Sequence, residues 1–426
     1  MFALADCNNF FVSCERVFRP DLEGRAVVVL SNNDGCAISR SNEAKALGVK
    51  MGQPFFEFEP LVRSGRVTVF SCNFPLYGDF SHRVHQTLRT FVPAIEIYSI
   101  DEAFLDLSGM EGEELDALAK RISRTCHRNT GIPVSVGIAP TKTLAKIASH
   151  LCKTHPKLLG GCYMHRPCDI EKVLRKTEIG EVWGIGRKFT AKLALYGIHT
   201  AYDFTQCEAT WVRALMGIGG LRTWQELRGT PSIDFLSGTP AKQQICVSRS
   251  FAKEITAVED LVRQVSLFAT MATEKLRKQH SVCQQAQVFI YTNRHRESAP
   301  QAYESQLVTF AVATDSTLEI NKAVLLALRQ MYRGGFGYKK AGVILSSISS
   351  KSTMQSVLFD AVDHPKHTKL MEIVDAINAK AGHSTIALAS QSTEGVRMNR
   401  DHLSPQYTTL WSDIITVKTE QKPEQK

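Results

Sequence analysis

The stretch YSIDEAFLDL, residues 98–107, gives the clearest fold signal in the chain, because two acidic residues stand in it between two alternating segments. IEIYSI (95–100) alternates toward Asp101 and Glu102, and AFLDL (103–107) alternates away from them. Alternation with a period of two is typical of β-strands. The stretch therefore predicts a β-hairpin with acids at its turn.

The segments around this hairpin have a readable order. FALAD (2–6) is an apolar strand, residues 113–129 have the spacing of an amphipathic helix, and VSVGIA (134–139) is another strand. We set residues 11–75 aside as an insertion and expect a helix over 78–91. The remaining order is β-α-β-β-α-β, which is ferredoxin-like.

This topology brings three carboxylates together. The first and third strands are central neighbours in it, so Asp6 meets Asp101 and Glu102 at one edge of the sheet. Carboxylates this close repel each other, and divalent cations offset the repulsion. Mg²⁺ prefers oxygen ligands, and two such ions can clamp the reacting oxygens of phosphoryl transfer. If Asp101 and Glu102 are considered without Asp6, the alternative to a metal site is a solvent-exposed hairpin turn.

Other segments carry weaker patterns. AVVVL (26–30) and VTVF (67–70) are strand candidates, and SRSNEAKALGVKMG (39–52) indicates a short helix capped by Ser39 or Ser41 and ended by Gly48. Residues 141–153 indicate a basic amphipathic helix. Its expected inward residues are Leu144, Ile147 and Leu151, and its expected outward residues are Lys142, Lys146 and Lys153.

Beyond residue 170 the pattern changes twice. Residues 170–228 are helical in pattern, and GTPSIDFLSGTPA (229–241) is typical of a linker. Strands and two long helices then indicate a small α+β domain up to about residue 350. A helix near 367–381 and a polar tail follow.

Composition narrows the class of protein. The 426 residues are 43% hydrophobic and 22% charged, as in soluble globular proteins, and no apolar run is long enough for a transmembrane helix. The start lacks the basic region of a secretory signal. The 11 cysteines are scattered without a Cys-x-x-Cys pair, which favours reduced thiols over disulfides or zinc.

The charge is uneven. The chain has a net charge of +9, and residues 241–350 hold 14 basic against 8 acidic side chains. A clustered basic excess suits the phosphate backbone of a nucleic acid. A solvated basic face without a partner is the alternative.

Five motifs together resemble the Y-family translesion DNA polymerases of the UmuC type. They are FALADCNNFFVSCE, SNEAKALGVKMG, YSIDEAFLDLSG, SVGIAPTKTLAKIAS and VWGIGRKFTAKL, and the resemblance extends from residue 1 to about 415. It implies an α+β multidomain fold. Its expected parts are a ferredoxin-like palm (1–10 and 76–166), inserted fingers (11–75), a helical thumb with a helix-hairpin-helix (167–230), a linker (231–242), an α+β little finger (243–350), and a C-terminal region with a clamp-binding peptide, partner-binding segments and a polar tail (351–426).

The resemblance also implies a metal centre and a catalytic site. Asp6, Asp101 and Glu102 match the family's metal-binding carboxylates. The backbone carbonyl of Cys7 is expected as a further ligand. The expected cofactor is Mg²⁺, as two ions.

Nucleotide contacts follow in the same way. Phe11 matches the aromatic steric gate, whose rigid ring leaves no room for a 2′-hydroxyl, and Phe10 lies beside it in the dNTP site. Ordinary core packing is the alternative for both rings, although adjacent side chains on one strand cannot both face inward. Lys45 and Lys153 match contacts to the triphosphate. Asn42 departs from the tyrosine common in the family, which puts one triphosphate hydrogen bond in doubt.

Two further motifs are expected to bind macromolecules. Gly184, Gly186, Arg187 and Lys188 have the look of a helix-hairpin-helix that holds a DNA phosphate at a helix N-terminus, with a plain helix–helix turn as the alternative. QSVLFD (355–360) resembles the peptide that docks on the β sliding clamp. Its expected contacts are Gln355, Leu358 and Phe359.

The resemblance implies an error-prone polymerase that acts in the SOS response, in the cytoplasm of a bacterium at the nucleoid. The implied partners are primer-template DNA, dNTP, a processed UmuD-type dimer, RecA and the β sliding clamp, and no membrane. Two other classes stay open. A nucleotide cyclase on the same palm would need no helix-hairpin-helix or clamp peptide, and a non-catalytic DNA-binding protein would not need its three carboxylates.

Overall fold

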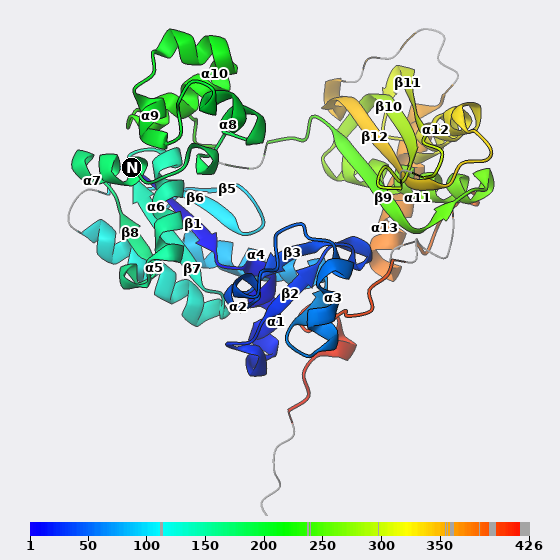
Figure 1. The fold of residues 1–426 in the computed structure, drawn as a ribbon. Coiled ribbons are helices and arrows are strands. Elements are labelled where there is room, and N and C mark those ends of the chain that lie inside the picture. The colour runs from blue at the N-terminus through cyan, green and yellow to red at the C-terminus, as the bar shows by residue number, and fades with distance from the viewer. Residues whose placement is uncertain are drawn as a thin grey trace, which may run out of the picture. The chain divides into compact units, whose positions relative to one another are not determined.

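The structure, a computed structural model, describes residues 1–426 except 111–113, 237, 239, 297, 354, 356, 358–361, 383, 392–397 and 418–426. Two compact units make up the chain (Figure 1). The first combines residues 1–239 with residues 401–426, and the second is residues 240–400. No helix in the described residues is long and apolar enough to cross a membrane.

A five-stranded sheet forms the centre of the first unit. Its order is β5 (Ile95–Ile97), β6 (Glu102–Asp106), β1 (Phe2–Cys7), β7 (Val134–Ala139) and β8 (Gly161–Tyr163). β1 pairs antiparallel with both β6 and β7, and β5 pairs antiparallel with β6. The hairpin predicted around the two acids is therefore present. β1 and β6 are central neighbours, as the β-α-β-β-α-β order requires.

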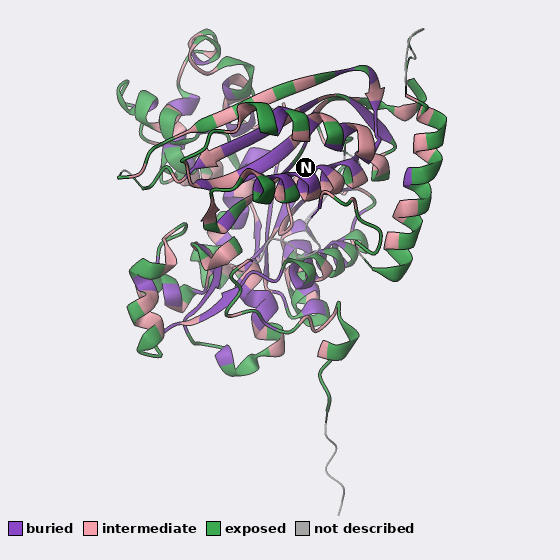
Figure 2. Ribbon diagram, turned by 90° about the vertical axis from the view of Figure 1, so that its right-hand side faces the viewer, coloured by how far each residue is buried: buried purple, intermediate pink, exposed green. Residues whose placement is uncertain are grey.

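Helices cover both faces of this sheet. One core holds Ala3, Ala5 and Leu105 with residues of α4 (Phe74–Arg89) and α5 (Glu114–Thr130). The other holds Leu4 and Phe104 with residues of α6 (Lys142–Thr154). Buried residues concentrate in the strands and on the inward helix faces (Figure 2). The close approach of α6 requires Gly137 in β7, because a Cβ there would lie 2.0 Å from the Ser149 backbone nitrogen.

The segment expected as an insertion contains a second, three-stranded sheet. Its order is β3 (Ala37–Arg40), β2 (Val27–Leu30) and β4 (Thr68–Ser71), joined by α2 (Asn42–Ala46) and α3 (Phe55–Arg63). Ser41 caps α2 by accepting a hydrogen bond from the Ala44 N–H. The alternative cap, Ser39, lies in β3 instead.

The two adjacent phenylalanines lie on a helix, so the rule that neighbours on one strand face opposite sides does not apply to them. β1 ends at Cys7, and Asn9 takes a left-handed backbone conformation with φ 47°. α1 (Phe10–Phe18) then begins at the first of the two rings. Helical spacing therefore separates Phe10, which is buried, from Phe11, which is half-buried.

One outward prediction for α6 is wrong. Lys142 is fully buried, and its ammonium group donates to Glu96 Oε2 at 2.5 Å and to the Asp234 carbonyl at 2.6 Å. It also lies 5.0 Å from the centre of the Phe104 ring. The helix faces a sheet on one side and residues 226–235 on another, so its first turn is enclosed. A helical wheel alone does not reveal that second neighbour.

Helices form the rest of the first unit up to the linker. They are α7 (Pro167–Leu174), α8 (Arg187–Ala194), α9 (Ala201–Thr205) and α10 (Ala209–Leu227). Glu226 ties them to α6, because its carboxylate accepts from the Thr143 N–H at 2.9 Å and its carbonyl accepts from the Thr141 hydroxyl at 2.8 Å.

The second unit is the α+β domain that the sequence predicts. Its sheet has the order β11 (Tyr303–Thr314), β10 (Ser281–Thr292), β12 (Tyr338–Ser350) and β9 (Ile245–Ile255). Two helices, α11 (Val258–Lys278) and α12 (Thr317–Met331), share its hydrophobic core.

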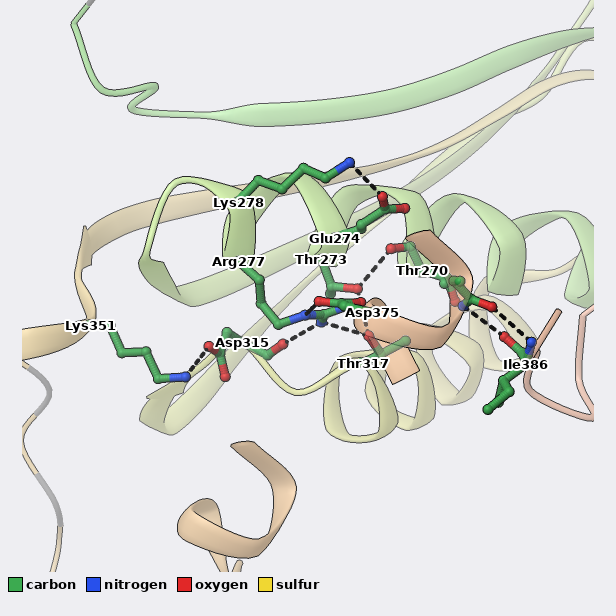
Figure 3. Close-up of polar contacts among 11 residues, drawn as sticks. Thr270, Thr273, Glu274, Arg277, Lys278, Asp315, Thr317, Lys351, Asp375 and Ile386 are labelled. Carbon is green, nitrogen blue, oxygen red and sulfur yellow. Dashed lines mark hydrogen bonds and ion pairs between the residues drawn. The ribbon is translucent and has the colours of Figure 1, made fainter. Parts of the chain in front are cut away.

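The C-terminal region divides between the two units. α13 (His364–Ala381) packs on α11, where Arg277 donates to both carboxylate oxygens of Asp375 at 2.6 and 2.7 Å (Figure 3). Ser390 continues this contact by bonding Ser266 at 2.7 Å. From Asp401 onward the chain belongs to the first unit. A boundary thus falls within the region 351–426 that the sequence suggested as one piece.

Candidate active site

Two of the predicted carboxylates lie directly opposite each other. Asp6 of β1 is the register partner of Glu102 of β6, and Asp101 immediately precedes β6. The Cys7 N–H donates to the Asp101 carbonyl at 2.9 Å, which closes the end of the β1–β6 ladder. The sheet therefore brings together residues that are almost 100 positions apart.

A serine that the sequence analysis missed organises the acidic turn. The Ser99 hydroxyl donates to Asp101 Oδ1 at 2.6 Å and accepts from the backbone N–H groups of Asp101 at 3.2 Å and Glu102 at 3.0 Å. A serine hydroxyl can bond the backbone two residues further along and so favours a turn, and Ser99 could have been predicted from the sequence on that ground. It holds the Asp101 carboxylate in place.

Two lysines of α6 pair with the carboxylates. Lys153 lies 2.6 Å from Asp6 Oδ2, and Lys146 lies 2.5 Å from Glu102 Oε1. Lys153 was expected near the site, whereas Lys146 was expected only on the outer face. A cavity of about 190 Å³ beside Asp6 is lined by these two lysines, His150 and Trp183 among others.

Burial and like charge control the ionisation of Asp6. The pKa of Asp6 is raised to about 6, because burial and the nearby Glu102 carboxylate together raise it more than Lys153 lowers it. In the described residues no three His, Cys, Asp or Glu side chains already form a metal centre. The donor types nevertheless fit a hard divalent cation, because buried carboxylates side by side need a positive charge.

Lys45 is a further cationic side chain near Lys153. Lys45 of α2 donates to Asn9 Oδ1 at 2.8 Å and to Asn42 Oδ1 at 3.3 Å. Burial lowers the pKa of Lys45, and the charges of Arg40 and Lys153 lower it further. The positive charges of Arg40 and Lys153 therefore repel that of Lys45, and Lys153 is also the partner of Asp6. Arg40 and Asn9 were not identified from sequence, whereas Asn42 takes part in the hydrogen bonding at Lys45.

The two phenylalanines at the start of α1 have different surroundings. Phe10 is 3% exposed and belongs to the core. Phe11 stacks on Tyr77 of α4, with ring centres 4.6 Å apart and planes at 18°. The edge of Phe74 meets it at 6.0 Å. Two rings of α4, Phe74 and Tyr77, therefore support the Phe11 ring, and they are called the aromatic shelf below.

The predicted helix-hairpin-helix forms a tight turn before α8. Gly184 has φ +89°, and a Cβ there would lie 2.8 Å from the Thr223 hydroxyl, so the position requires glycine. Gly186 is the residue before α8, and its surroundings are open. Arg187 and Lys188 are exposed at the helix start. The N-terminus of α8 is therefore accessible to a phosphate.

The clamp peptide is only partly described. Gln355 is exposed. Leu358 and Phe359 lie outside the described residues.

Four family models match the chain. The impB/mucB/samB family matches residues 5–150, its C-terminal domain matches 242–358, the IMS family HHH motif matches 167–198, and a domain of unknown function matches 368–417.

Relatives match over almost the whole chain. Protein UmuC of Salmonella typhimurium is 41% identical over 98% of this chain and 100% of its own length. Protein ImpB of Salmonella typhimurium is 39% identical over 97% of this chain and 99% of its own length. DNA polymerase IV of Desulfatibacillum aliphaticivorans is 26% identical over 92% and 97%, respectively.

Solved structures share the fold. A Y-family DNA polymerase chimera of Dbh and Dpo4 superposes with a TM-score of 0.68 at 22% identity, covering 82% of this chain and 100% of its own. An insertion ternary complex of Dbh DNA polymerase gives a TM-score of 0.54 at 23% identity, covering 82% and 100%.

Proposed function

This chain belongs to the impB/mucB/samB family of Y-family DNA-directed DNA polymerases, and on that premise we propose that it performs error-prone translesion synthesis. It would add deoxynucleotides from dNTP to a primer 3′-OH opposite damaged template during SOS damage tolerance and mutagenesis. The observation that carries the proposal is the register pairing of Asp6 with Glu102 on the two central strands, with Asp101 beside them.

The carboxylates are proposed to hold two Mg²⁺ ions. Asp6, Asp101, Glu102 and the Cys7 carbonyl supply only oxygen donors, which suits this ion. When bound, the ions would favour ionisation of the primer hydroxyl and stabilise the charge on the leaving pyrophosphate. In the structure Lys153 and Lys146 neutralise Asp6 and Glu102 instead. These lysines would therefore exchange partners when nucleotide and metal enter.

The cations around Lys45 are proposed to bind the triphosphate. Burial lowers the pKa of Lys45, and repulsion from the positive charges of Arg40 and Lys153 lowers it further. A polyanion relieves that repulsion and anchors the nucleotide in line with the primer. Asn42 would hold Lys45 rather than contact the phosphates, because it accepts a hydrogen bond from its ammonium group.

Phe11 is proposed to exclude ribonucleotides, whereas Phe10, the other residue predicted in the dNTP site, packs in the core behind it. The Phe11 ring is half-buried and supported by Tyr77, so it can face a sugar without yielding. Beyond the active site, Gly184, Gly186, Arg187 and Lys188 would hold a DNA phosphate at the start of α8. Such a contact is independent of base sequence.

The predicted palm, fingers, thumb and little-finger boundaries belong to the same proposal. So do the partners: primer-template DNA, a processed UmuD-type dimer, RecA, and the β sliding clamp through Gln355, Leu358 and Phe359. The proposed place of action is the bacterial cytoplasm, at the nucleoid.

Asp101→Asn tests the site directly. The substitution removes a charge from the proposed metal ligands while keeping side-chain shape, so nucleotide incorporation should fall by about a hundredfold or more, as for loss of a major charge-stabilising group. DNA binding and thermal stability should stay near those of the unmodified protein. Primer extension with Mg²⁺ and dNTP measures the rate.

Asp106→Asn is the matched control. Asp106 ends β6, the strand that Asp101 precedes, but its carboxylate accepts only from the Ser108 backbone N–H and hydroxyl in the described contacts. It should retain most of the activity. Extension by Asp101→Asn within tenfold of the unmodified protein would overturn the assignment, and a product formed without primer would favour the cyclase alternative.

A further inference from the structure

Residues 401–410, named here the C-terminal strap, lie against the elements that carry the Phe11 ring. The strap begins beside β4, where the His402 carbonyl accepts from the Ser71 N–H at 2.9 Å and its N–H donates to the Ser71 hydroxyl at 3.0 Å. Further along, Tyr407 stacks on Phe18 of α1 with ring centres 4.3 Å apart. The strap therefore contacts both β4 and α1.

Ser404 is the buried centre of the strap. Its hydroxyl donates to Glu15 Oε1 of α1 at 3.0 Å and accepts from the Asn73 side-chain amide at 3.0 Å. Asn73 is the N-cap of α4 and also donates to the Pro405 carbonyl at 3.2 Å. One serine thus joins α1 to the first turn of α4.

Glu15 connects this serine to the aromatic shelf. The Tyr77 hydroxyl donates to the same Glu15 Oε1 at 2.7 Å, and the Tyr77 ring is the surface on which Phe11 stacks at 4.6 Å. Glu15 and Tyr77 are both fully buried. The contacts form an unbroken path from Ser404 through Glu15 and Tyr77 to Phe11.

A buried carboxyl is costly unless a specific arrangement requires it. Glu15 makes no ion pair among the described residues, its Oε2 has no hydrogen-bond partner there, and burial raises its pKa to about 6. An apolar side chain would fill this space at lower cost. The acid instead accepts two hydrogen bonds on one oxygen, one from the shelf and one from the strap.

We propose that the C-terminal strap positions the steric gate: Ser404, through Glu15, fixes the Tyr77 ring that backs Phe11, and so sharpens discrimination against ribonucleotides. The inference rests on the proposed role of Phe11. It gives part of the matched domain of unknown function a role in substrate selection. Ser404, Glu15 and Tyr77 are positioning residues, because they act on the sugar only through the Phe11 ring.

Ser404→Ala in the full chain tests the proposal. Single-nucleotide insertion with matched dNTP and rNTP should show the rNTP/dNTP ratio rising about fivefold, the factor expected for the loss of one hydrogen bond. Insertion of dNTP itself should change little. Ser412→Ala is the control, because this exposed serine bonds only Asp413 in the described contacts, and it should leave the ratio unchanged.

Two more variants separate the possible failures. Phe11→Ala is the reference, and the double variant Phe11→Ala/Ser404→Ala should equal it, because the strap acts through the ring. Tyr77→Phe keeps the stacking ring but loses the bond to Glu15, so it should raise the ratio even if Ser404→Ala fails to fold.

The outcomes are distinct. A raised ratio in Phe11→Ala with an unchanged ratio in Ser404→Ala and Tyr77→Phe overturns the strap proposal and leaves the gate intact. An unchanged ratio in Phe11→Ala overturns the gate itself, and the strap proposal with it. An equal loss of dNTP and rNTP insertion in Ser404→Ala would make the strap merely structural.

Discussion

At the scale of single residues, exposure separates the roles of the two adjacent phenylalanines. Phe11→Ala should raise ribonucleotide insertion relative to dNTP at least about tenfold, which corresponds to about 1.4 kcal/mol of lost discrimination. The half-buried ring can be removed without opening the core. Single-nucleotide insertion assays with matched dNTP and rNTP measure the ratio.

Phe10→Ala is the matched comparison. This ring is 3% exposed in the core, so its removal should cost about 3–5 kcal/mol of stability. Thermal unfolding distinguishes the two variants. If Phe11→Ala loses that much stability and leaves the ratio unchanged, Phe11 is core packing.

Glu15 should make the stability of the fold decrease as the pH rises. Its pKa is raised from 4.5 to about 6 by burial, so the fold favours the protonated acid. The stabilisation is complete below pH 4.5 and is lost as the pH rises through 6. Tyr77, Cys14 and Tyr407 are its titratable neighbours, and its charge helps to raise the pKa of each.

Glu15→Gln keeps an acceptor oxygen and cannot ionise. The free energy of unfolding of this variant, relative to the unmodified protein, should therefore increase by about 1 kcal/mol between pH 5 and pH 7.5. Denaturant unfolding at the two pH values measures it. A difference that is constant with pH would show that Glu15 titrates normally in the fold.

At the scale of elements, α6 uses three lysines in two different ways. Lys153 and Lys146 reach the carboxylates of the site, whereas Lys142 is enclosed with Glu96. Lys142→Ala would leave Glu96, 12% exposed, without its cation, although the Leu236 N–H still donates to it at 2.9 Å. We expect a loss of about 3–5 kcal/mol in stability, measured by thermal or denaturant unfolding.

Lys120→Ala supplies the surface counterpart. Lys120 pairs with Asp116 at 2.6 Å on α5, but both side chains are substantially exposed. Its loss should therefore change stability by less than about 1 kcal/mol. Equal effects of the two substitutions would contradict the burial of the Lys142–Glu96 pair.

At the scale of the whole molecule, the clamp peptide offers a functional test. Replacing Leu358 and Phe359 together by Ala should leave synthesis on short templates unchanged and remove stimulation by the sliding clamp, because apolar anchors dominate such peptide contacts. Val357→Ala is the control from the same peptide, and it should retain stimulation. Primer extension with and without the clamp measures both. Insoluble, destabilised double variants would instead indicate a structural role.

The C-terminal region also packs against the folded parts of the chain. α13 is anchored on the second unit by the Arg277–Asp375 pair, and the strap is anchored on the first unit by Ser404. Both anchors lie within the stretch that matches a domain of unknown function. This region therefore bonds separately to each of the two compact units.

Sequence alone predicted the β-α-β-β-α-β order of the central sheet and the meeting of Asp6 with Asp101 and Glu102, because hydrophobic periodicity is a local pattern and few strand topologies suit that order. Only the tertiary structure placed Lys142 in the interior, paired Lys146 with Glu102, and brought Ser404 to Glu15, 389 positions away. These contacts depend on which distant segment of the chain packs against each side chain. A pattern over a few neighbouring residues contains no information about that segment, so it cannot predict the partner.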